Sequence, residues 1–453
     1  MSTGKLPLAT KLGFGAGDIA NNLFFTTASL YLLYYYTEVL GLSPAVGGWI
    51  FAGALVWDAI ADPIMGYIAT RTRTRWGRYR PYILFGSVPL AASWVLMFVP
   101  TGLDGWALVL FALAAHMLFR TVYTIVGMPY LSLSAAMTSD SRERGTLAAY
   151  RMIGATACGL FVAFSTLKLA ELIGGGDTMR GFLLTSILYG TIATLLLFVT
   201  FATSFERPET PETDGPLPDR RAMVAMLRAN RPLQIVALWL LANSMASTLF
   251  GKTLPYVLKY ELQRPDLIGP VLASLTAAAM VSIPVWAAVA KRTSKRTITL
   301  CGAAMGITGY LAILLEPPGV GPLLFATTAW IGFGAGAGYL AFWSMVPDTV
   351  EYGQYRTGTR AEGVVFGTIA FVQKAALGVS VGILGELLSL IGFVPNAVQT
   401  PETLANMRLL LTIGPIMMLL LGIAAIWFYA IDARLHARLV RVLRRRYPGD
   451  MPA

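Results

Sequence analysis

The feature that most constrains this chain is a succession of about twelve apolar stretches, each near the roughly 20 residues that a helix needs to cross a bilayer. Only 13% of its 453 residues are charged, about half the share usual in a soluble domain. We therefore expect an all-α, polytopic membrane protein with twelve transmembrane helices. They are predicted near residues 10–39, 44–70, 80–101, 105–136, 145–172, 181–203, 233–260, 267–290, 297–316, 321–347, 362–390 and 405–432.

One polar, proline-rich segment divides these stretches into two sets of six. It reads SFERPETPETDGPLPDRRAMVAMLRANRP and follows the sixth stretch. The pattern predicts an N-terminal six-helix bundle at residues 1–203, a cytoplasmic linker at 204–232, a C-terminal bundle at 233–433 and a basic tail at 434–453. This is the layout of the major facilitator fold, in which substrate binds near the midplane between the two halves.

Basic residues are concentrated in alternate connections and in the tail. The connections after the first, third and ninth stretches contain no Lys or Arg, whereas the connection after the second is rich in arginine. Because Lys and Arg collect in cytoplasmic loops, we expect a multi-pass protein of the bacterial inner (plasma) membrane with both termini in the cytoplasm. The same loops account for the net charge of +11, so nucleic acid is not an expected partner.

Two acids, Asp58 and Asp62, interrupt the second apolar stretch in the string WDAIADP. They lie one helical turn apart, and therefore on one face of a helix. Acids at this depth of a bilayer are costly and occur mainly where they bind ions, protons or substrate. Two neighbouring carboxylates also repel each other, which favours a proton- or cation-binding pair. The alternative is a structural pair with a base on a neighbouring helix.

Several strings along the chain together resemble the glycoside–pentoside–hexuronide:cation symporters, the family that includes melibiose permease. The strings are KLGFGAGDIANN, YLLYYYTEVLGL, WDAIADPIMGYIATRTRTRWGRYRPYIL, YTIVGMPYLSL, SRERGTLAAYR and VPDTVEYGQYRTGTR. The resemblance implies a secondary active transporter that couples a sugar, glycoside or hexuronide to H+ or Na+ by alternating access. It also implies that Asp58, Asp62 and Thr124 bind the cation, and it matches Lys374 to a lysine of the eleventh helix.

The chain departs from melibiose permease at positions that bear on both ligands. Gly127 stands where that relative has a third cation-site acid, Asn22 where it has an acidic sugar ligand, and Leu131 and Tyr339 where it has sugar-contacting tryptophans. Because Gly127 supplies no oxygen ligand, we expect H+ rather than Na+ as the coupling ion. Beyond a Na+ site at Asp58, Asp62 and Thr124, no metal is expected, and no cofactor.

Arg120 is an unexpected base near the middle of the fourth apolar stretch. It lies four residues from His116 and seven from Gly127, on one stripe of the helix. At 1.5 Å rise per residue it reaches about the same depth as Asp58. One interpretation is a buried ion pair with Asp58 or Asp62. The other is a bidentate site for an anionic substrate group. His116 is predicted to be a hydrogen-bonded packing residue.

The remaining candidate substrate residues carry weaker signals. Arg151 could serve only as a membrane-interface anchor, Lys374 as a structural bridge, and the aromatic residues as packing. Asn21 and Asn22 could simply bond neighbouring helices. Together with Arg120, the predicted substrate site comprises Asp18, Asn22, Tyr123, Arg151, Gln373, Lys374, Tyr339 and Trp343.

Two further patterns lead to structural predictions. Tyr34, Tyr35 and Tyr36 resemble an aromatic belt at the membrane interface. A second group is expected to form a charged cytoplasmic loop, either as a gate network or as a solvated turn. It comprises Asp348, Glu351, Tyr352, Arg356 and Arg360.

Three other functions compete with sugar symport. Lysolipid or other amphiphile transporters share the acid motif of the second helix. An intramembrane enzyme is not expected, because the sequence contains no HExxH motif. A sugar sensor would need a signalling domain. We expect a monomer in the lipid bilayer that carries a small sugar or glycoside, including an anionic one.

Overall fold

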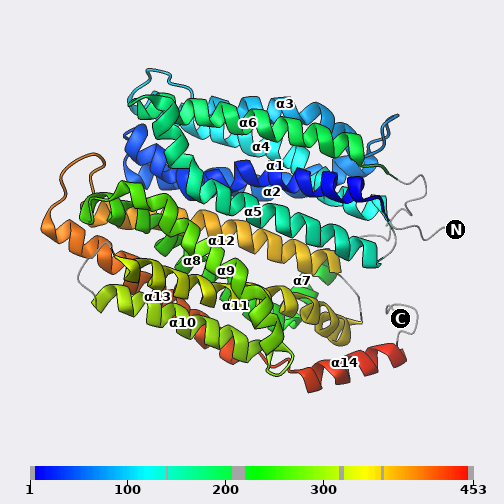
Figure 1. Cartoon of the computed structure of the whole chain (residues 1–453). Helices are drawn as coiled ribbons and strands as arrows, with labels where there is room; N and C mark the ends of the chain where they lie inside the picture. The colour runs from blue at the N-terminus through cyan, green and yellow to red at the C-terminus, as the bar shows by residue number, and fades with distance from the viewer. Residues whose placement is uncertain (1–5, 139–140, 207–219, 316–320, 359–361, 447–453) are drawn as a thin grey trace. The chain divides into compact units, whose positions relative to one another are not determined.

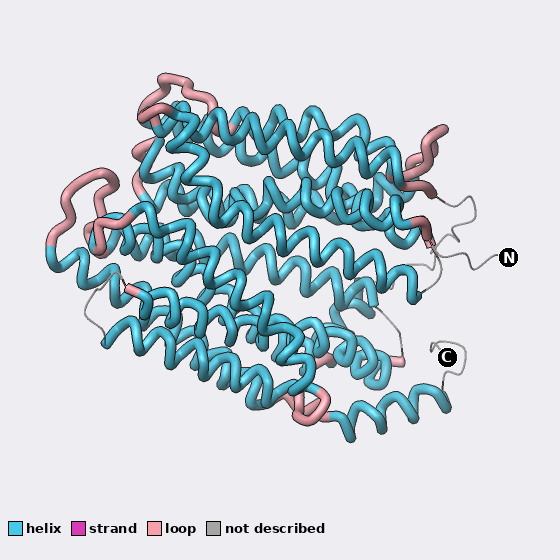
Figure 2. Tube along the Cα trace, viewed as in Figure 1, coloured by secondary structure: helices cyan, strands magenta, loops and turns pink. Residues whose placement is uncertain are grey.

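The computed structural model describes residues 6–138, 141–206, 220–315, 321–358 and 362–446. Within these ranges the chain is helical apart from short connections, and no strand is formed (Figure 2). The chain divides into two compact units. The first comprises Met1–Glu212, Asp266–Ala273 and Val381–Gln399, and the second comprises Thr213–Pro265, Ser274–Ser380 and Thr400–Ala453.

The first unit is built mainly from six long helices. Helix α1 packs against α5 and α6, α2 against α4, and α3 against both α4 and α6 (Figure 1). Small residues permit these close approaches: a Cβ on Gly17 of α1 would lie 2.5 Å from the Tyr130 ring of α4. The helices are α1 (Leu8–Tyr34), α2 (Pro44–Arg71), α3 (Arg80–Leu96), α4 (Gly105–Met137), α5 (Ser141–Gly174) and α6 (Thr178–Thr203).

The second unit contains the remaining helices, including most of α9 and α12. Helix α8 packs against α11 and α13, α10 against α11 and α13, and α14 against α11. Its core includes Trp239 of α8 stacked on Phe342 of α11, with ring centroids 6.0 Å apart. The helices are α7 (Arg220–Ala229), α8 (Arg231–Tyr256), α9 (Ile268–Ala290), α10 (Lys295–Leu315), α11 (Pro322–Thr357), α12 (Glu362–Leu390), α13 (Pro401–Trp427) and α14 (Ala433–Arg446).

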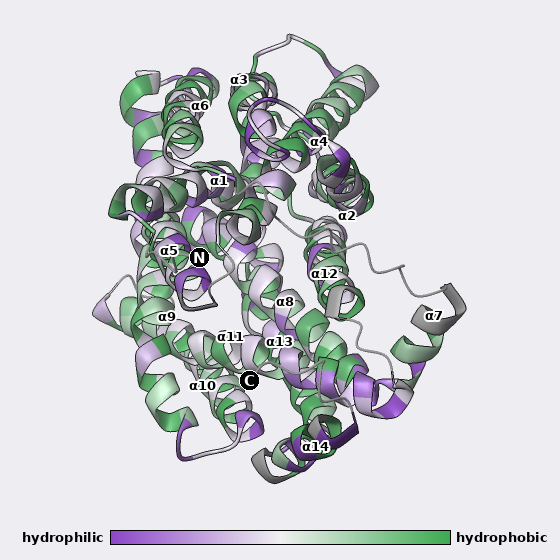
Figure 3. Ribbon diagram, turned by 90° about the vertical axis from the view of Figure 1, so that its right-hand side faces the viewer, coloured by the Kyte–Doolittle hydropathy of each residue, from purple (hydrophilic) through white to green (hydrophobic). Residues whose placement is uncertain are grey.

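The predicted all-α membrane fold is confirmed. Among the described residues, ten helices are long and apolar enough to cross a bilayer. Helices α1 and α3 complete the predicted twelve: α3 has only 17 residues, and α1 carries the polar residues Asp18, Asn21 and Asn22. Apolar residues predominate along the long helices (Figure 3). Two shorter helices, α7 and α14, form within the segments predicted as linker and tail.

The predicted aromatic belt is wrong for two of its three tyrosines. Residues Tyr35–Val39 form a π-helical turn at the end of α1, and Tyr35 and Tyr36 are buried. The Tyr35 ring packs against Phe98 and Phe182, with centroids 4.8 and 5.2 Å away. The extra residue in a π turn rotates the following side chains away from the direction that α-helical spacing predicts.

The predicted charged loop is also corrected, because α11 continues to Thr357 and makes it helical. Asp348 is buried there, with both carboxylate oxygens 2.7–2.8 Å from Lys295 Nζ. The Tyr429 hydroxyl donates to Asp348 at 3.3 Å, and burial, followed by the nearby carboxylate, raises the pKa of Tyr429. His436 of α14 lies 2.6 Å from Glu351. Arg360 lies outside the described residues.

Candidate functional site

The two acids of α2 converge on a hydroxyl of α4. Ser43 caps α2 and Pro44 occupies its first turn, and the helix continues through Pro63 without a break. It therefore presents Asp58 and Asp62 on one face. Thr124 Oγ1 lies 2.8 Å from an Oδ1 of each acid. Asp58 is buried, whereas Asp62 is partly exposed.

This contact has a defined chemical requirement. A threonine hydroxyl carries one hydrogen, so it donates to only one of the two carboxylates at a time. The Thr124 oxygen also lies 2.8 Å from the carboxylate that does not receive this hydrogen. That second contact needs a further proton or a cation to be attractive. The three oxygens of Asp58, Asp62 and Thr124 thus form a compact acceptor for a single positive charge. No cluster of three or more His, Cys, Asp or Glu suited to a metal occurs in the part of the chain that the structure describes.

Arg120 is held by a buried hydrogen-bonded chain on the same side of α4. Its Nε donates to His116 Nε2 at 3.3 Å, and His116 Nδ1 lies 3.1 Å from the Tyr36 hydroxyl. Because Nε2 accepts a hydrogen bond, His116 is neutral with its proton on Nδ1. His116 is therefore the hydrogen-bonded packing residue that was predicted, and Tyr36, which the sequence pattern assigned to the interface, orients it.

The Arg120 guanidinium lies beside Asp58. Its Nη1 is 3.9 Å from Asp58 Oδ2, and the two side chains are 0% and 1% exposed. Neither Nη1 nor Nη2 has a hydrogen-bond partner among the described residues. The guanidinium therefore faces one nearby carboxylate and keeps two unused donors, a costly arrangement in a buried place. Phenyl rings surround it at 5.8–6.0 Å, namely those of Phe25, Phe51 and Phe119.

A second ion pair joins α1 to α5. Arg151 Nη2 and Nε lie 3.0 and 3.2 Å from Asp18 Oδ1, and the guanidinium lies 5.4 Å from the Tyr130 ring centroid. Asn22, a predicted substrate ligand, donates its side-chain amide to the Asp18 carbonyl of its own helix at 2.8 Å. The Asn22 side-chain oxygen accepts a hydrogen bond from the Thr26 hydroxyl, 3.5 Å away.

Asn21 is a site residue that sequence reasoning missed. Its Oδ1 is buried and has no hydrogen-bond partner in the described part of the chain. A Cβ added at Gly127 would make ordinary van der Waals contacts, 3.8 Å from Tyr123 Cε1 and 4.0 Å from Asn21 Oδ1. Gly127 therefore lies beside both this unbonded acceptor and Tyr123, a predicted substrate residue. The sequence contained one signal for Asn21, its place beside Asn22 on a polar helix.

The other predicted substrate residues belong to the second unit. Tyr339 and Trp343 lie one turn apart on α11, both exposed, with ring centroids 6.4 Å apart. On α12, Gln373 is exposed and Lys374 is partly buried. The structure thus assembles two groups within the first unit, one around Asp58 and one around Asp18, and a separate aromatic pair on α11.

The Asp18–Arg151 pair predicts a specific loss of stability. In Arg151→Gln, Asp18 remains a poorly solvated charge without its partner, which costs about 3–5 kcal/mol when a pair is fully buried. We expect a lower melting temperature in detergent, and partial recovery in the double variant Asp18→Asn/Arg151→Gln. Arg151 is one-quarter exposed, which reduces the expected loss. Additive losses in the double variant would show that the two residues act independently.

Comparison with known proteins also indicates a transport protein. A family model described as MFS/sugar transport protein matches residues 13–433. The uncharacterized symporter YnaJ of Bacillus subtilis is 31% identical over 448 residues, covering 98% of this chain and 96% of its own. The glucuronide carrier protein homolog of Escherichia coli is 29% identical over 438 residues, covering 96% and 95%.

Solved structures share the fold at low sequence identity. The inward-facing crystal structure of a bacterial homologue of the human lysosomal transporter Spinster superposes with a TM-score of 0.68. The alignment covers 95% of this chain and 96% of the other, at 13% identity. At this identity the likeness concerns the fold alone.

Proposed function

Because the chain belongs to the family of MFS/sugar transport proteins, and is thus a multi-pass membrane protein for sugar or glycoside symport, we propose that its coupling ion is a proton. The proton is held by Asp58, Asp62 and Thr124. The observation that carries this proposal is the single Thr124 hydroxyl, 2.8 Å from both carboxylates.

A proton fits this site better than a metal cation does. Hard cations are usually held by many oxygen ligands, six to eight for Ca²⁺. Here three side chains supply oxygens, and Gly127 has no side chain to add another. A proton needs only two oxygens at hydrogen-bond distance, which the Thr124 contacts supply.

The charges around the site indicate how coupling works. Asp58 and Asp62 carry two negative charges when both are ionised, and the Arg120 guanidinium lies beside Asp58. Asp58 is buried, whereas Asp62 is partly exposed and therefore the more accessible of the two to proton exchange. Asp62 is therefore the acid that exchanges the proton. Binding that proton removes one negative charge from the group, which lowers the cost of moving it through an apolar barrier.

Substrate recognition is the second part of the proposal. Two guanidinium nitrogens of Arg120 have no hydrogen-bond partner among the described residues, and Arg120 stands beside the ion site, so a substrate carboxylate would satisfy it bidentately. The enclosed guanidinium becomes reachable only when neighbouring side chains move during alternating access. One relative is named a glucuronide carrier homolog, which supports an anionic sugar such as a hexuronide. Asp18, Asn22, Tyr123, Arg151, Gln373, Lys374, Tyr339 and Trp343 are proposed to complete the substrate path.

Three further properties belong to the same proposal. Both termini lie in the cytoplasm, because the arginine-rich connection between α2 and α3 follows the distribution of cytoplasmic loops. The protein acts in the bacterial inner membrane as a monomer. It moves its substrate without covalent change, as expected for a secondary transporter.

The acid pair predicts loss of concentrative transport on neutralisation. Asp62→Asn keeps the shape of the side chain but removes the group that exchanges the proton, so pH-gradient-driven accumulation of a transported glycoside should fall to the background level. Exchange of labelled for unlabelled substrate should persist, because it needs no net proton movement. Asp58→Asn should also abolish accumulation. The control is Asp104→Asn, which changes an exposed acid at the start of α4. Normal accumulation in both variants would contradict the assignment.

Arg120 predicts a charge-dependent change in affinity. Losing one partner of a buried charged pair costs about 3–5 kcal/mol. Arg120→Gln should therefore lower the affinity for an anionic ligand by about two or more orders of magnitude. We would measure calorimetric binding of methyl glucuronide and its neutral counterpart, methyl glucoside. The neutral sugar should change much less. Equal losses for the two ligands would rule out anion recognition and leave Arg120 as a structural partner of Asp58.

A further inference from the structure

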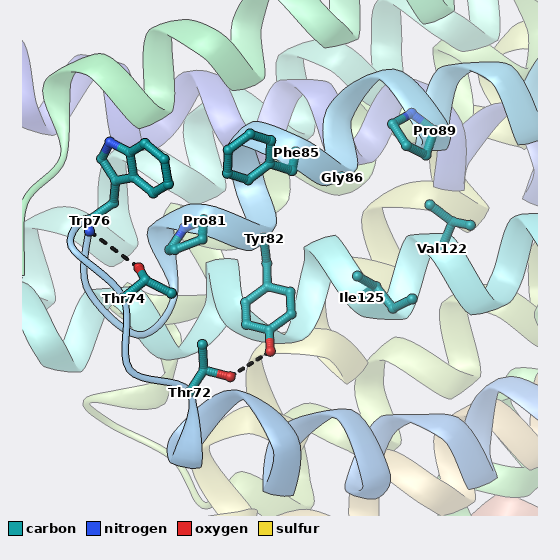
Figure 4. A pocket seen from close by; sticks show the side chains of 10 residues that line it. All are labelled: Thr72, Thr74, Trp76, Pro81, Tyr82, Phe85, Gly86, Pro89, Val122 and Ile125. Atoms are coloured by element: carbon teal, nitrogen blue, oxygen red, sulfur yellow. Dashed lines mark hydrogen bonds between the residues drawn. The ribbon is translucent and has the colours of Figure 1, made fainter.

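An apolar groove lies between α3, α4 and the α2–α3 connection, and neither acid of the pair lines it. It has a volume of about 480 Å³, within the range of small-molecule sites. Figure 4 shows that side chains of α3 and α4 form its wall and that the α2–α3 connection closes one end. The lining residues are Thr72, Thr74, Trp76, Pro81, Tyr82, Phe85, Gly86, Pro89, Val122 and Ile125.

The wall of the groove has few free hydrogen-bonding groups for a water-soluble ligand. Phe85 is 59% exposed and packs edge-on against Trp76, with ring centroids 5.3 Å apart. The hydroxyls of Thr72 and Tyr82 bond to each other at 2.5 Å, and Thr74 bonds within its own turn (Figure 4). A hydrocarbon chain matches such a wall, because it has no polar group that the wall would leave without a hydrogen-bond partner.

Exposed arginines stand beside the groove. Arg71 lies over the Tyr67 ring and Arg75 over the Trp76 ring, with guanidinium carbons 3.7 and 4.0 Å from the centroids. Neither arginine has an acidic partner within the described residues. Each aromatic ring orients a planar donor whose hydrogen-bonding edge is free for an oxyanion, and guanidinium matches phosphate geometry.

The connection that carries these arginines has a fixed shape. Glu206, just beyond α6, accepts backbone N–H bonds from Arg78, Tyr79 and Arg80 at 2.7–2.9 Å. These amides begin α3 and lack partners within the helix, so the carboxylate caps it. Gly77 has φ +108°, and a Cβ there would lie 2.5 Å from Glu206. These contacts therefore fix the position of the α2–α3 connection relative to the groove.

We propose that this groove binds one acyl chain of an anionic phospholipid, whose phosphate rests on Arg71 and Arg75. The apolar wall explains the acyl chain, and the adjacent guanidinium groups of Arg71 and Arg75 explain the negative headgroup. The groove contains none of the residues of the proposed ion or substrate site. The lipid is therefore a bound accessory rather than the transported molecule, and its binding does not depend on the identity of the coupling ion.

Native mass spectrometry of the full chain in detergent tests this site with phosphatidylglycerol and phosphatidylcholine of identical acyl chains. The wild type should retain phosphatidylglycerol in preference. Each base near an anionic surface strengthens binding roughly fivefold. The double variant Arg71→Gln/Arg75→Gln should therefore lower the affinity for phosphatidylglycerol by roughly ten- to thirtyfold. The matched control, Lys291→Gln/Arg292→Gln, removes two exposed bases from the α9–α10 connection and should leave this binding unchanged.

Filling the groove provides the second arm. Val122→Trp should displace phosphatidylglycerol, whereas Leu110→Trp, at a 63% exposed position of the same helix outside the groove, should not. Glycerol phosphate, which has the headgroup charge but no acyl chain, should compete poorly. Equal loss in the two double variants, undiminished binding in Val122→Trp, or full competition by glycerol phosphate would each overturn the proposal.

Discussion

A charge within the membrane needs a partner, and this requirement organises the interior of the first unit. Water is not available there to solvate ions, so acids and bases occur in contact. Asp18 lies against Arg151 and Asp58 against Arg120. Asp62 shares the Thr124 hydroxyl with Asp58. One hydroxyl hydrogen therefore serves two carboxylates, which gives the group a place to bind and release a further proton.

Much of this arrangement was predictable from the sequence. Apolar length and the spacing of basic residues indicated the membrane helices, because the bilayer permits few alternatives to a helix of about 20 residues. The spacing of Asp58 and Asp62 placed them on one face, and counting residues placed Arg120 at the depth of Asp58. Helical periodicity is a local property, so these predictions needed no knowledge of the tertiary structure.

The errors arose where tertiary contacts or irregular turns decide the outcome. The π turn after α1 rotated Tyr35 and Tyr36 into the core, where Tyr36 meets His116, 80 residues away. Asp348 looked like a loop residue because its charge ended an apolar stretch, but Lys295 allows it to remain inside α11. Glu206 gives no local sign that it caps α3. Asn21 and Asn22 have the same side chain, and only their neighbours distinguish the orphan oxygen from the bonded one.

The central claim is that one proton, shared through Thr124, drives transport. Reconstituted vesicles in which a pH gradient and a Na+ gradient are imposed separately provide the most direct measurement, with uptake of a panel of neutral and anionic glycosides as the readout. The account predicts accumulation under an inward proton gradient in Na+-free buffer, and none under a Na+ gradient at constant pH. Accumulation driven by Na+ alone would contradict it.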